Sequence, residues 1–519
     1  MSAVARAAAA GDHSPVMLHI RPDVTDVYAV IEPLWQRGSR TPYATTRAYA
    51  MARTAFAMCR TAVAPYIQFL SLCYFPGGTM LLELIKKGTL AAATLAAFAA
   101  STTASAWNPP DFPRVGGIQI GSPFNYNDPN YEQQLAKQSI TILADYVGFA
   151  PGGMSMQTVA TKIKAINPNT LIFVYTNVNE LRADQTATTT SWGNYRTAVD
   201  KMKWWLYSDK SLTRNVTSSF GATAINTTLF APKDSSGKTW MDWAANYYVT
   251  NYAKPAPALD GLYMDNLFSR PYINGDWNRD GVVDSQTDPK VQTWFREGYA
   301  RYFATLKSLM PGKYQIGNIG DWGGKDTVQT EYQGMVNGGV LEAYLGKSWS
   351  VETWGGWAAM FAQYRKAMSA VAAPKLVIFN QWGSKTDYQS MRYGLGTCLL
   401  DDAYYGFSDT SQGYYGVVWF DELDQKLGAG QAKPNAAWQK GVWRRDFDNG
   451  IVLVNPKGNG PQTVTLEAPY IKIKGAQDPL VNNGQTVTTV TLKDRDGIIL
   501  LRQKPMIRPA TPGGFQIEH

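Results

Sequence analysis

Short apolar runs alternate with segments of helical spacing between residues 115 and 420. Because short apolar runs bounded by turn residues are typical of buried strands, the pattern predicts strands joined by helices. Eight strands that alternate with helices indicate a closed (β/α)8 barrel, the TIM barrel of the α/β class. An open, doubly wound sheet is the alternative, but no predicted strand precedes a G-x-G-x-x-G or Walker loop. The predicted strands cover residues 115–121, 140–147, 170–176, 260–266, 314–319, 339–344, 375–380 and 415–420.

The pattern changes after about residue 430, where short strands follow one another without helices. Asp448-Asn449-Gly450 lies between two apolar runs and is a hairpin signal, because Asn-Gly favours the tight turn of a β-hairpin. We therefore expect a barrel over residues 107–430 and a small all-β, sandwich-like domain over residues 431–519. The expected role of the second domain is to buttress the barrel. Its further strands are predicted at residues 462–466, 470–473, 486–492 and 497–501.

Residues 80–106 have the three parts of a secretory signal in the right order. Lys86 and Lys87 form the charged part, and an apolar core too short to span a bilayer comfortably follows. Ala104-Ser105-Ala106 fits the small-residue cleavage rule. We expect cleavage after Ala106, a secreted or periplasmic bacterial protein, and no integral membrane association after cleavage. A buried, alanine-rich helix is the alternative interpretation.

A secretory signal belongs at the start of a translated protein, yet residues 1–79 precede this one. Those residues show no convincing hydrophobic period. We therefore expect that translation starts at Met80, and that residues 1–79 are a non-native extension from a mis-assigned start or are disordered.

Composition excludes several classes of function. The net charge of +8 falls to +4 after residue 106, because residues 1–106 hold nine Lys and Arg against five Asp and Glu. No concentrated basic run indicates nucleic-acid binding. After signal cleavage only Cys398 and His519 remain of their types, which rules out Ser-His-Asp and Cys-His catalysis, zinc sites of His or Cys, and a disulfide within one chain. Catalysis must then use carboxylates, helped by Tyr, Lys or a hard metal ion, and we expect it to require no cofactor.

Two carboxylates end predicted strands. Backbone alternation puts Tyr263 and Asp265 on one side of the run 260–266, and Glu342 lies at the end of the run 339–344. In a closed barrel these ends face one mouth, where barrel enzymes keep their chemistry. Two carboxylates across that mouth suit glycoside hydrolysis, one as nucleophile or base and one as general acid with a raised pKa. Roughly 5–5.5 Å between them would mean retention of configuration and about 6.5–9.5 Å inversion, and the sequence leaves both open. A loop cap or a structural salt bridge is the alternative role for each.

Further polar or aromatic residues follow predicted strands and are candidates to bind sugar hydroxyls or stack on a sugar ring. In the alternative interpretation each is an ordinary loop residue. Asp421 and Glu422 are the main rivals for a catalytic role, and Asp145 and Tyr146 rank below them. The full set of candidate substrate-binding residues is Asn177, Asn318, Asp321, Gln381, Trp382, Asp421 and Glu422. The 17 Trp and 29 Tyr give weak support to a carbohydrate ligand, because these rings stack on sugars but also fill cores.

Residues 276–284 match the first nine positions of a calcium-binding loop, with Gly281 at the turn. Position twelve is Thr287, where a bidentate Glu is usual, so a solvated, turn-rich loop is the alternative. We expect a structural Ca²⁺ that stiffens the barrel mouth rather than one that acts in catalysis. The expected ligands are Asp276, Asn278, Asp280, Val282 and Asp284.

Three motifs resemble one family. Asp260–Asn266 (DGLYMDN), Gly338–Tyr344 (GGVLEAY) and Arg445–Asn455 (RDFDNGIVLVN) are similar to motifs of hypothetical glycosyl hydrolase-like family fifteen, which is related to endo-α-1,4-polygalactosaminidase-like barrels. The resemblance covers about residues 115–505. It implies a barrel, a C-terminal β domain and glycosidase activity, with Asp265 as nucleophile or base and Glu342 as general acid. It does not supply a substrate.

The leading hypothesis is a secreted glycoside hydrolase that cleaves O-glycosidic bonds of a polysaccharide by a two-carboxylate mechanism. The first alternative is a non-catalytic barrel that binds carbohydrate without turnover. The second is a metal-assisted hydrolase or esterase that uses the calcium-like loop. Sugar, linkage, endo or exo action and oligomeric state are left open.

Overall fold

A computed structural model of the chain describes residues 2–6, 15–19, 107–121, 123–144, 154–182, 191–213, 216–217, 221–324 and 326–503. The chain divides into two compact units, Met1–Ser105 and Ala106–His519. In the first unit the described residues are β1 (Ser2–Arg6) and β2 (Pro15–His19), which pair antiparallel. The predicted leader over residues 80–106 lies outside the described residues, as do Asp145 and Tyr146.

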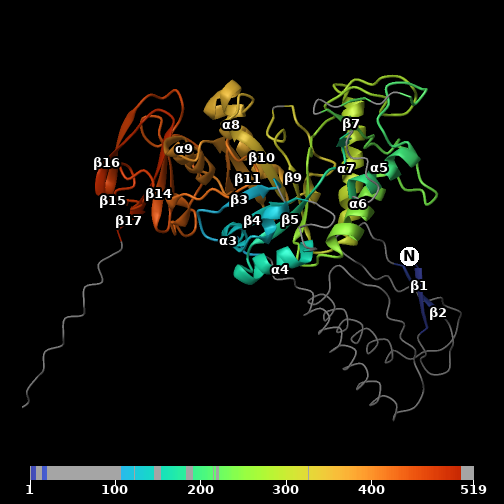
Figure 1. Cartoon of the computed structure of the whole chain (residues 1–519), viewed down its shortest axis with the longest axis horizontal. Coiled ribbons are helices and arrows are strands. Elements are labelled where there is room, and N and C mark those ends of the chain that lie inside the picture. Colours follow the sequence, from blue (N-terminus) through green and yellow to red (C-terminus); the bar gives the residue numbers. More distant parts are fainter. Residues whose placement is uncertain are drawn as a thin grey trace, which may run out of the picture. The chain divides into compact units, whose positions relative to one another are not determined.

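Eight parallel strands form one sheet in the described part of the second unit (Figure 1), in the order β12-β11-β10-β9-β8-β5-β4-β3. A bridge between Val115 and Tyr405 joins the first strand to the last, so the sheet closes on itself. The predicted (β/α)8 barrel is therefore confirmed. The strands are β3 (Gly116–Gln119), β4 (Ile140–Leu143), β5 (Leu171–Thr176), β8 (Gly261–Met264), β9 (Tyr314–Asn318), β10 (Gly338–Leu345), β11 (Leu376–Gly383) and β12 (Tyr404–Asp409).

Helices connect the strands. Their ends carry ordinary signals: Asp288 caps α7 by accepting a hydrogen bond from the Lys290 backbone N–H, and Pro289 stands at the first helical position. The helices are α3 (Pro129–Lys137), α4 (Met156–Ile166), α5 (Ser191–Met202), α6 (Trp240–Tyr248), α7 (Pro289–Leu309), α8 (Val351–Ala370) and α9 (Tyr388–Leu399). A short antiparallel pair, β6 (Glu180–Arg182) and β7 (Ala222–Ala224), lies outside the barrel sheet.

The eighth strand is β12, and the prediction that residues 415–420 form it was wrong. Residues 415–420 are rich in aromatic and β-branched side chains, yet they form an irregular segment. β12 contains Gly406 and Ser408, which are poor strand formers, and it is held instead by backbone pairing with β11. Helix α9, which precedes β12, already ends at Leu399. Pairing with a neighbouring strand has here overridden local propensity.

Alternation along each strand separates two cores. Tyr263 of β8 packs with a cluster inside the barrel, whereas Leu262 and Met264 pack in the larger core that also contains residues of the surrounding helices. The interior cluster consists of Ile118, Ile140, Ile142, Leu171, Phe173, Tyr263, Ile316, Val340, Leu376, Ile378 and Tyr404. As predicted, Asp265 follows on the interior side of β8, two residues after Tyr263.

The C-terminal residues form a five-stranded antiparallel sheet within the described range 443–502, in the order β13-β14-β17-β15-β16. The predicted hairpin around Asp448-Asn449-Gly450 is confirmed, since Phe447 pairs with Gly450 across its turn. Helix α9 of the barrel packs against β14 and β17. The strands are β13 (Trp443–Phe447), β14 (Gly450–Asn455), β15 (Gln462–Lys472), β16 (Thr486–Leu492) and β17 (Asp496–Arg502).

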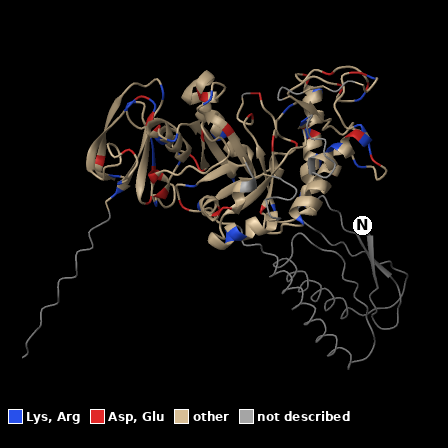
Figure 2. Cartoon of the chain, viewed as in Figure 1, with Lys and Arg blue, Asp and Glu red and all other residues tan. Residues whose placement is uncertain are grey.

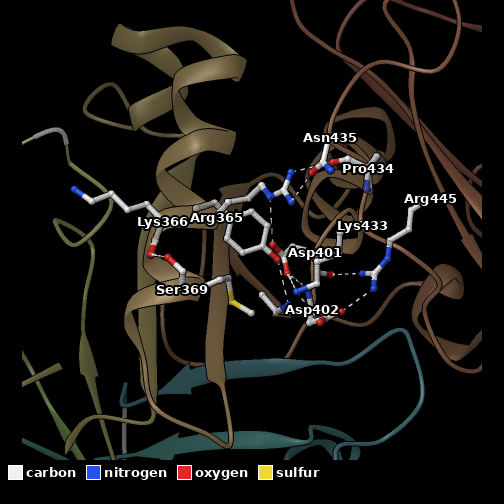
Figure 3. A network of polar contacts seen from close by, with 12 residues as sticks. Arg365, Lys366, Ser369, Asp401, Asp402, Lys433, Pro434, Asn435 and Arg445 are labelled. Carbon is white, nitrogen blue, oxygen red and sulfur yellow. Dashed lines mark hydrogen bonds and ion pairs between the residues drawn. The ribbon is translucent and has the colours of Figure 1, made fainter. Parts of the chain in front are cut away.

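A network of charges joins this sheet to the barrel (Figure 3). Arg445 of β13 donates to the backbone oxygens of Leu399 and Asp401 and to the Asp402 carboxylate. Lys433 lies 2.5 Å from Asp401 and 2.8 Å from Asp402. Burial alone would raise the pKa of Asp402, but the hydrogen bonds from Lys433 and Arg445 hold it below its ordinary value. The segment between α9 and β12 is therefore the anchor of the C-terminal sheet.

Basic and acidic residues are interspersed over the second unit (Figure 2). None of the helices in the described residues is both long enough and apolar enough to cross a membrane.

Candidate active site

Asp265 follows β8 directly and is held in place by its neighbours. Its backbone N–H donates to Thr176 O of β5. Its carboxylate accepts hydrogen bonds from the Tyr175 hydroxyl at 2.6 Å, from Asn318 Nδ2 at 3.2 Å and from the Asn266 backbone N–H at 2.9 Å. The side chain is partly exposed. These donors orient the carboxylate group toward the interior of the barrel mouth.

Glu342 stands where β10 becomes irregular. The pairing of β10 with β11 shifts register between Leu341 and Leu345, and Ala343 has a positive φ of 47°. Such a bulge re-aims the side chains beside it, and a non-glycine residue at this φ is strained. Asn380 Oδ1 accepts from the Ala343 N–H at 3.0 Å, and the Ser350 hydroxyl donates to Ala343 O at 2.6 Å, so both sides of the bulge are pinned.

Asn318, at the end of β9, joins the two carboxylates. Its Nδ2 donates to Asp265 Oδ1 at 3.2 Å and to Glu342 Oε2 at 2.8 Å. Because one atom lies that close to both, the two oxygens are at most about 6 Å apart, the sum of the two distances. The structure thus brings the two predicted catalytic residues and Asn318 together at one mouth.

Glu342 also accepts a hydrogen bond from the Tyr414 hydroxyl. Burial raises the pKa of Glu342 above its ordinary value, and the charge of Asp265 raises it further. The hydrogen bonds from Tyr414 and Asn318 and the charge of Lys347 oppose this increase, but the net shift of the pKa is upward. A carboxyl group in this environment keeps its proton to a higher pH than a free glutamate, which suits a general acid.

Aromatic rings continue the site beyond Glu342. Trp382, one of the predicted candidates, packs edge-on against Tyr414 with ring centroids 5.2 Å apart, and Lys347 Nζ lies 3.8 Å above the Trp382 ring. Sequence reasoning missed Tyr175, Tyr414 and Lys347. Tyr175 could have been found by alternation within β5, whereas Tyr414 lies in a loop that was mistaken for the approach to a strand.

Three other candidates are used in packing. Gln381 is fully buried, and its amide bonds to Ser390 and the Tyr405 hydroxyl, which leaves no surface for a ligand. Asn177 is buried in a turn, where its side chain accepts from the Asn179 N–H. Asp321 accepts two hydrogen bonds from Ser269, and burial raises its pKa. None of these contacts joins a candidate to either carboxylate of the pair.

Asp421 and Glu422 do not follow a strand, because the segment before them is irregular. They form the short helix η4 (Asp421–Asp424) and face the C-terminal sheet. Asp421 exchanges hydrogen bonds with Gln477, and Glu422 accepts from Asn482 and is 1% exposed. They were predicted as rivals for the catalytic role. The structure instead places them in the contact between the barrel and the C-terminal sheet domain.

The calcium-like loop is closed by its own hydrogen bonds. Asp276 Oδ2 accepts from the Gly281 N–H, and Asp284 Oδ2 accepts from the N–H groups of Trp277 and Asn278. Among the described residues, no group of three or more His, Cys, Asp or Glu is arranged to hold a metal ion. One observation still fits a cation: Asp276 is 2% exposed, and its Oδ1 has no hydrogen-bond partner in the structure. The calcium site therefore stays a prediction.

A family model described as "Hypothetical glycosyl hydrolase family 15" matches residues 164–451. The match contains Asp265, Asn318, Glu342 and Tyr414. No curated protein sequence matches the chain.

Solved structures of similar fold include carbohydrate-active proteins. An α-amylase from Geobacillus thermoleovorans, complexed with acarbose, is 9% identical, covers 77% of this chain and 100% of its own, and has a TM-score of 0.43. The glycoside hydrolase domain of PelA from Pseudomonas aeruginosa is 12% identical over 62% of this chain and 98% of its own, with a TM-score of 0.35. The type III pullulan hydrolase from Thermococcus kodakarensis is 13% identical over 75% of each chain, with a TM-score of 0.40.

Proposed function

The chain belongs to hypothetical glycosyl hydrolase family 15, and on that premise we propose that Asp265 and Glu342 together cleave the O-glycosidic bonds of a polysaccharide. The observation that carries the proposal is the single Asn318 amide hydrogen-bonded to both carboxylates. Two acidic groups held this close at a barrel mouth are the arrangement that glycoside hydrolysis uses.

We assign Glu342 as general acid and base, and Asp265 as nucleophile. Glu342 is the group with the raised pKa, so it can protonate the leaving oxygen while Asp265 attacks the anomeric carbon. The resulting glycosyl ester on Asp265 is then hydrolysed by a water that gives its proton to the Glu342 carboxylate. The sugar departs with the water's oxygen, and both residues return to their starting states.

We propose retention rather than inversion of configuration, because one oxygen of Asp265 and one oxygen of Glu342 lie within about 6 Å of each other. Retaining enzymes hold the two carboxyl groups roughly 5–5.5 Å apart, whereas inverting enzymes need about 6.5–9.5 Å to admit a water.

The test is sugar release from a panel of bacterial and plant polysaccharides by the Asp265→Asn and Glu342→Gln variants. We expect each to lose activity by about a thousandfold or more while its folded spectrum persists, because each substitution removes a group that acts in the transition state. Glu297→Gln removes an exposed carboxylate from α7 and should keep full activity. If both site variants kept wild-type activity, the assignment would be wrong.

The anomer released first distinguishes retention from inversion. Proton NMR should show a product with the configuration of the substrate before mutarotation sets in. An inverted product would refute the retaining mechanism and leave the carboxylate pair in place. Glycan binding with no release from any polysaccharide would favour the carbohydrate-binding alternative.

We also propose that the protein is secreted after cleavage behind Ala106. The charged, apolar and small-residue parts of residues 80–106 support this. N-terminal sequencing of the exported protein should begin at Trp107, and peptides from residues 1–79 in that protein would contradict the proposed start at Met80.

A further inference from the structure

A cleft of about 960 Å³ lies on the same rim as the carboxylates but is not lined by them. Its walls come from helix α3, from the loops after β3, β11 and β12, and from the C-terminal sheet domain. Ligand pockets usually measure about 300–1,000 Å³, so this one is large enough for several linked sugar units. Its walls include Asn125, Tyr388, Gln412, Tyr415, Trp419 and Gln477.

Tyr415 offers an exposed ring in a fixed position. Its side chain is 58% exposed, and a Cβ added at Gly121 would lie only 2.4 Å from the ring, so the ring rests directly on the glycine backbone. Asn125 Nδ2 donates to Tyr415 O at 3.3 Å, and Tyr414 O accepts from the Gly121 N–H at 3.0 Å. Because the neighbouring Tyr414 contacts Glu342, the cleft adjoins the catalytic pair.

Trp419 is held by contacts from its own segment after β12 and from the C-terminal sheet domain. Its Nε1 donates to Asp424 at 2.9 Å. Gln477, which lies between β15 and β16, donates to Trp419 O at 3.2 Å and exchanges hydrogen bonds with Asp421. The C-terminal sheet domain thus builds one wall of the cleft in addition to supporting the barrel.

The lining carries amides and hydroxyls rather than net charge. Its charged lining residues are Lys385 and Asp128, and Lys137 Nζ lies 5.3 Å from the centroid of the Trp419 ring. Lys385 interacts with Asp409, and Asp128 accepts from the Asn130 N–H as the cap of α3. Aromatic rings beside neutral hydrogen-bonding groups match the apolar faces and hydroxyl edges of uncharged sugars. Each of the two nearby cations already has a partner, Lys385 in Asp409 and Lys137 in the Trp419 ring.

We propose that this cleft binds neutral sugar units of the polysaccharide at a distance from the bond that Asp265 and Glu342 cleave. The proposal rests on the proposed function and names its substrate class: an uncharged chain that the enzyme cuts internally, with the chain held on Tyr415 and Trp419. A polyuronate chain is not a substrate of this class.

The test measures binding to the inactive Glu342→Gln protein, so that turnover does not interfere. The probes are malto-, cello- and N-acetylchito-oligosaccharides of increasing length, and polygalacturonate and alginate as anionic chains. We expect at least one neutral series to bind more tightly as it lengthens and the anionic chains not to bind. In that background Tyr415→Ala should weaken binding of the long members about tenfold, the effect of losing one aromatic anchor.

Tyr415→Phe keeps the ring and should keep the binding. Trp354→Ala removes another exposed ring, which does not line the cleft, and should leave binding unchanged. The proposal is overturned if no neutral series binds, if the anionic chains bind as well, or if Tyr415→Ala and Trp354→Ala act alike. These outcomes are separate from the proposed function, whose failure would appear as sugar release by Glu342→Gln itself.

Discussion

At the scale of single residues, the pKa of Glu342 is set by opposing neighbours. Burial and Asp265 raise it, whereas the hydrogen bonds from Tyr414 and Asn318 and the charge of Lys347 lower it. A general acid works only while protonated, so activity should fall as pH rises through this pKa. The alkaline limb of the pH profile is therefore a direct measure of these contacts.

Tyr414→Phe removes a donor that favours the ionised form of Glu342. The pKa of Glu342 should then rise further, and the alkaline limb of kcat/KM should move to higher pH by roughly half to one unit. The measurement is kcat/KM against pH on one polysaccharide. The control is Tyr332→Phe, which removes a buried hydroxyl that donates to Phe268 O rather than to Glu342. In this variant the alkaline limb of kcat/KM should stay at the wild-type pH. A limb that moved to lower pH in Tyr414→Phe would contradict the assignment of Glu342 as the acid.

Residue-level prediction worked where a strand ended as expected. Asp265, Glu342 and Asn318 were predicted from strand ends, and the structure brings them together. Gln381 was placed at the mouth because the pattern ended its strand at residue 380, whereas β11 continues to Gly383. Within a strand, alternation turns Gln381 outward to α9 and Trp382 inward toward Tyr414. A misplaced strand end therefore changes which residues count as mouth residues.

At the scale of elements, β8 and β9 approach so closely that only glycine fits at Gly261. A Cβ there would lie 1.9 Å from Tyr314 O and 2.9 Å from the Phe173 ring. Gly261→Ala must push two strands apart, and we expect it to lower the free energy of unfolding by about 3 kcal/mol. Urea denaturation measures this. Gly334→Ala, where the added carbon meets nothing within 4 Å, should change stability little. If both variants lost the same free energy of unfolding, the close approach of β8 and β9 at Gly261 would not contribute to stability.

The loop between β8 and α7 is the second element with a testable property. Ca²⁺ should raise the melting temperature of the chelator-treated protein by a few degrees, because an ion that binds only the folded state stabilises it. Asp276→Asn should abolish this increase, and Asp326→Asn, at an exposed carboxylate elsewhere, should not. Sugar release should persist without calcium, since the ion is expected to stiffen the mouth only. If the melting temperature were the same with and without Ca²⁺, the calcium site would be refuted and the loop would be a solvated turn.

Element-level prediction succeeded for seven strands of the barrel and for the hairpin of the C-terminal sheet. It failed at the eighth, because the more strand-like sequence at residues 415–420 lies outside the sheet. β12 gains its stability from backbone bonds to β11 and from its place beside Val115. Such contacts join residues far apart in the chain, and no local pattern encodes them.

At the scale of the whole molecule, Arg445 links barrel and sheet. It is 3% exposed, so Arg445→Met would leave Asp402 and three carbonyl oxygens without this donor. We expect a loss of about 3 kcal/mol in the free energy of unfolding. Arg502→Met removes an exposed partner of Asp446 and should cost about 1 kcal/mol or less. Thermal unfolding of both variants measures these losses in the free energy of unfolding. Similar losses in the two variants would refute the proposed role of Arg445 in linking barrel and sheet.

The same link should weaken in acid. The pKa of Asp402 is lowered in the folded state, so its contribution to stability is present above the ordinary aspartate pKa of about 3.9. That contribution is lost as pH falls through the lower folded value. In Arg445→Met this part of the acid dependence should be reduced.

The closure of the barrel has a practical consequence for anyone who trims the gene. The family match starts at residue 164, after β3 and β4, and stops at residue 451, inside the hairpin of the C-terminal sheet. A fragment cut at those limits would lack β3 and β4, the two strands that join β5 to β12 in the closed sheet. Both β5 and β12 would then have unpaired edges, which are prone to self-association. It would also lose Gln477, and with it one wall of the sugar cleft.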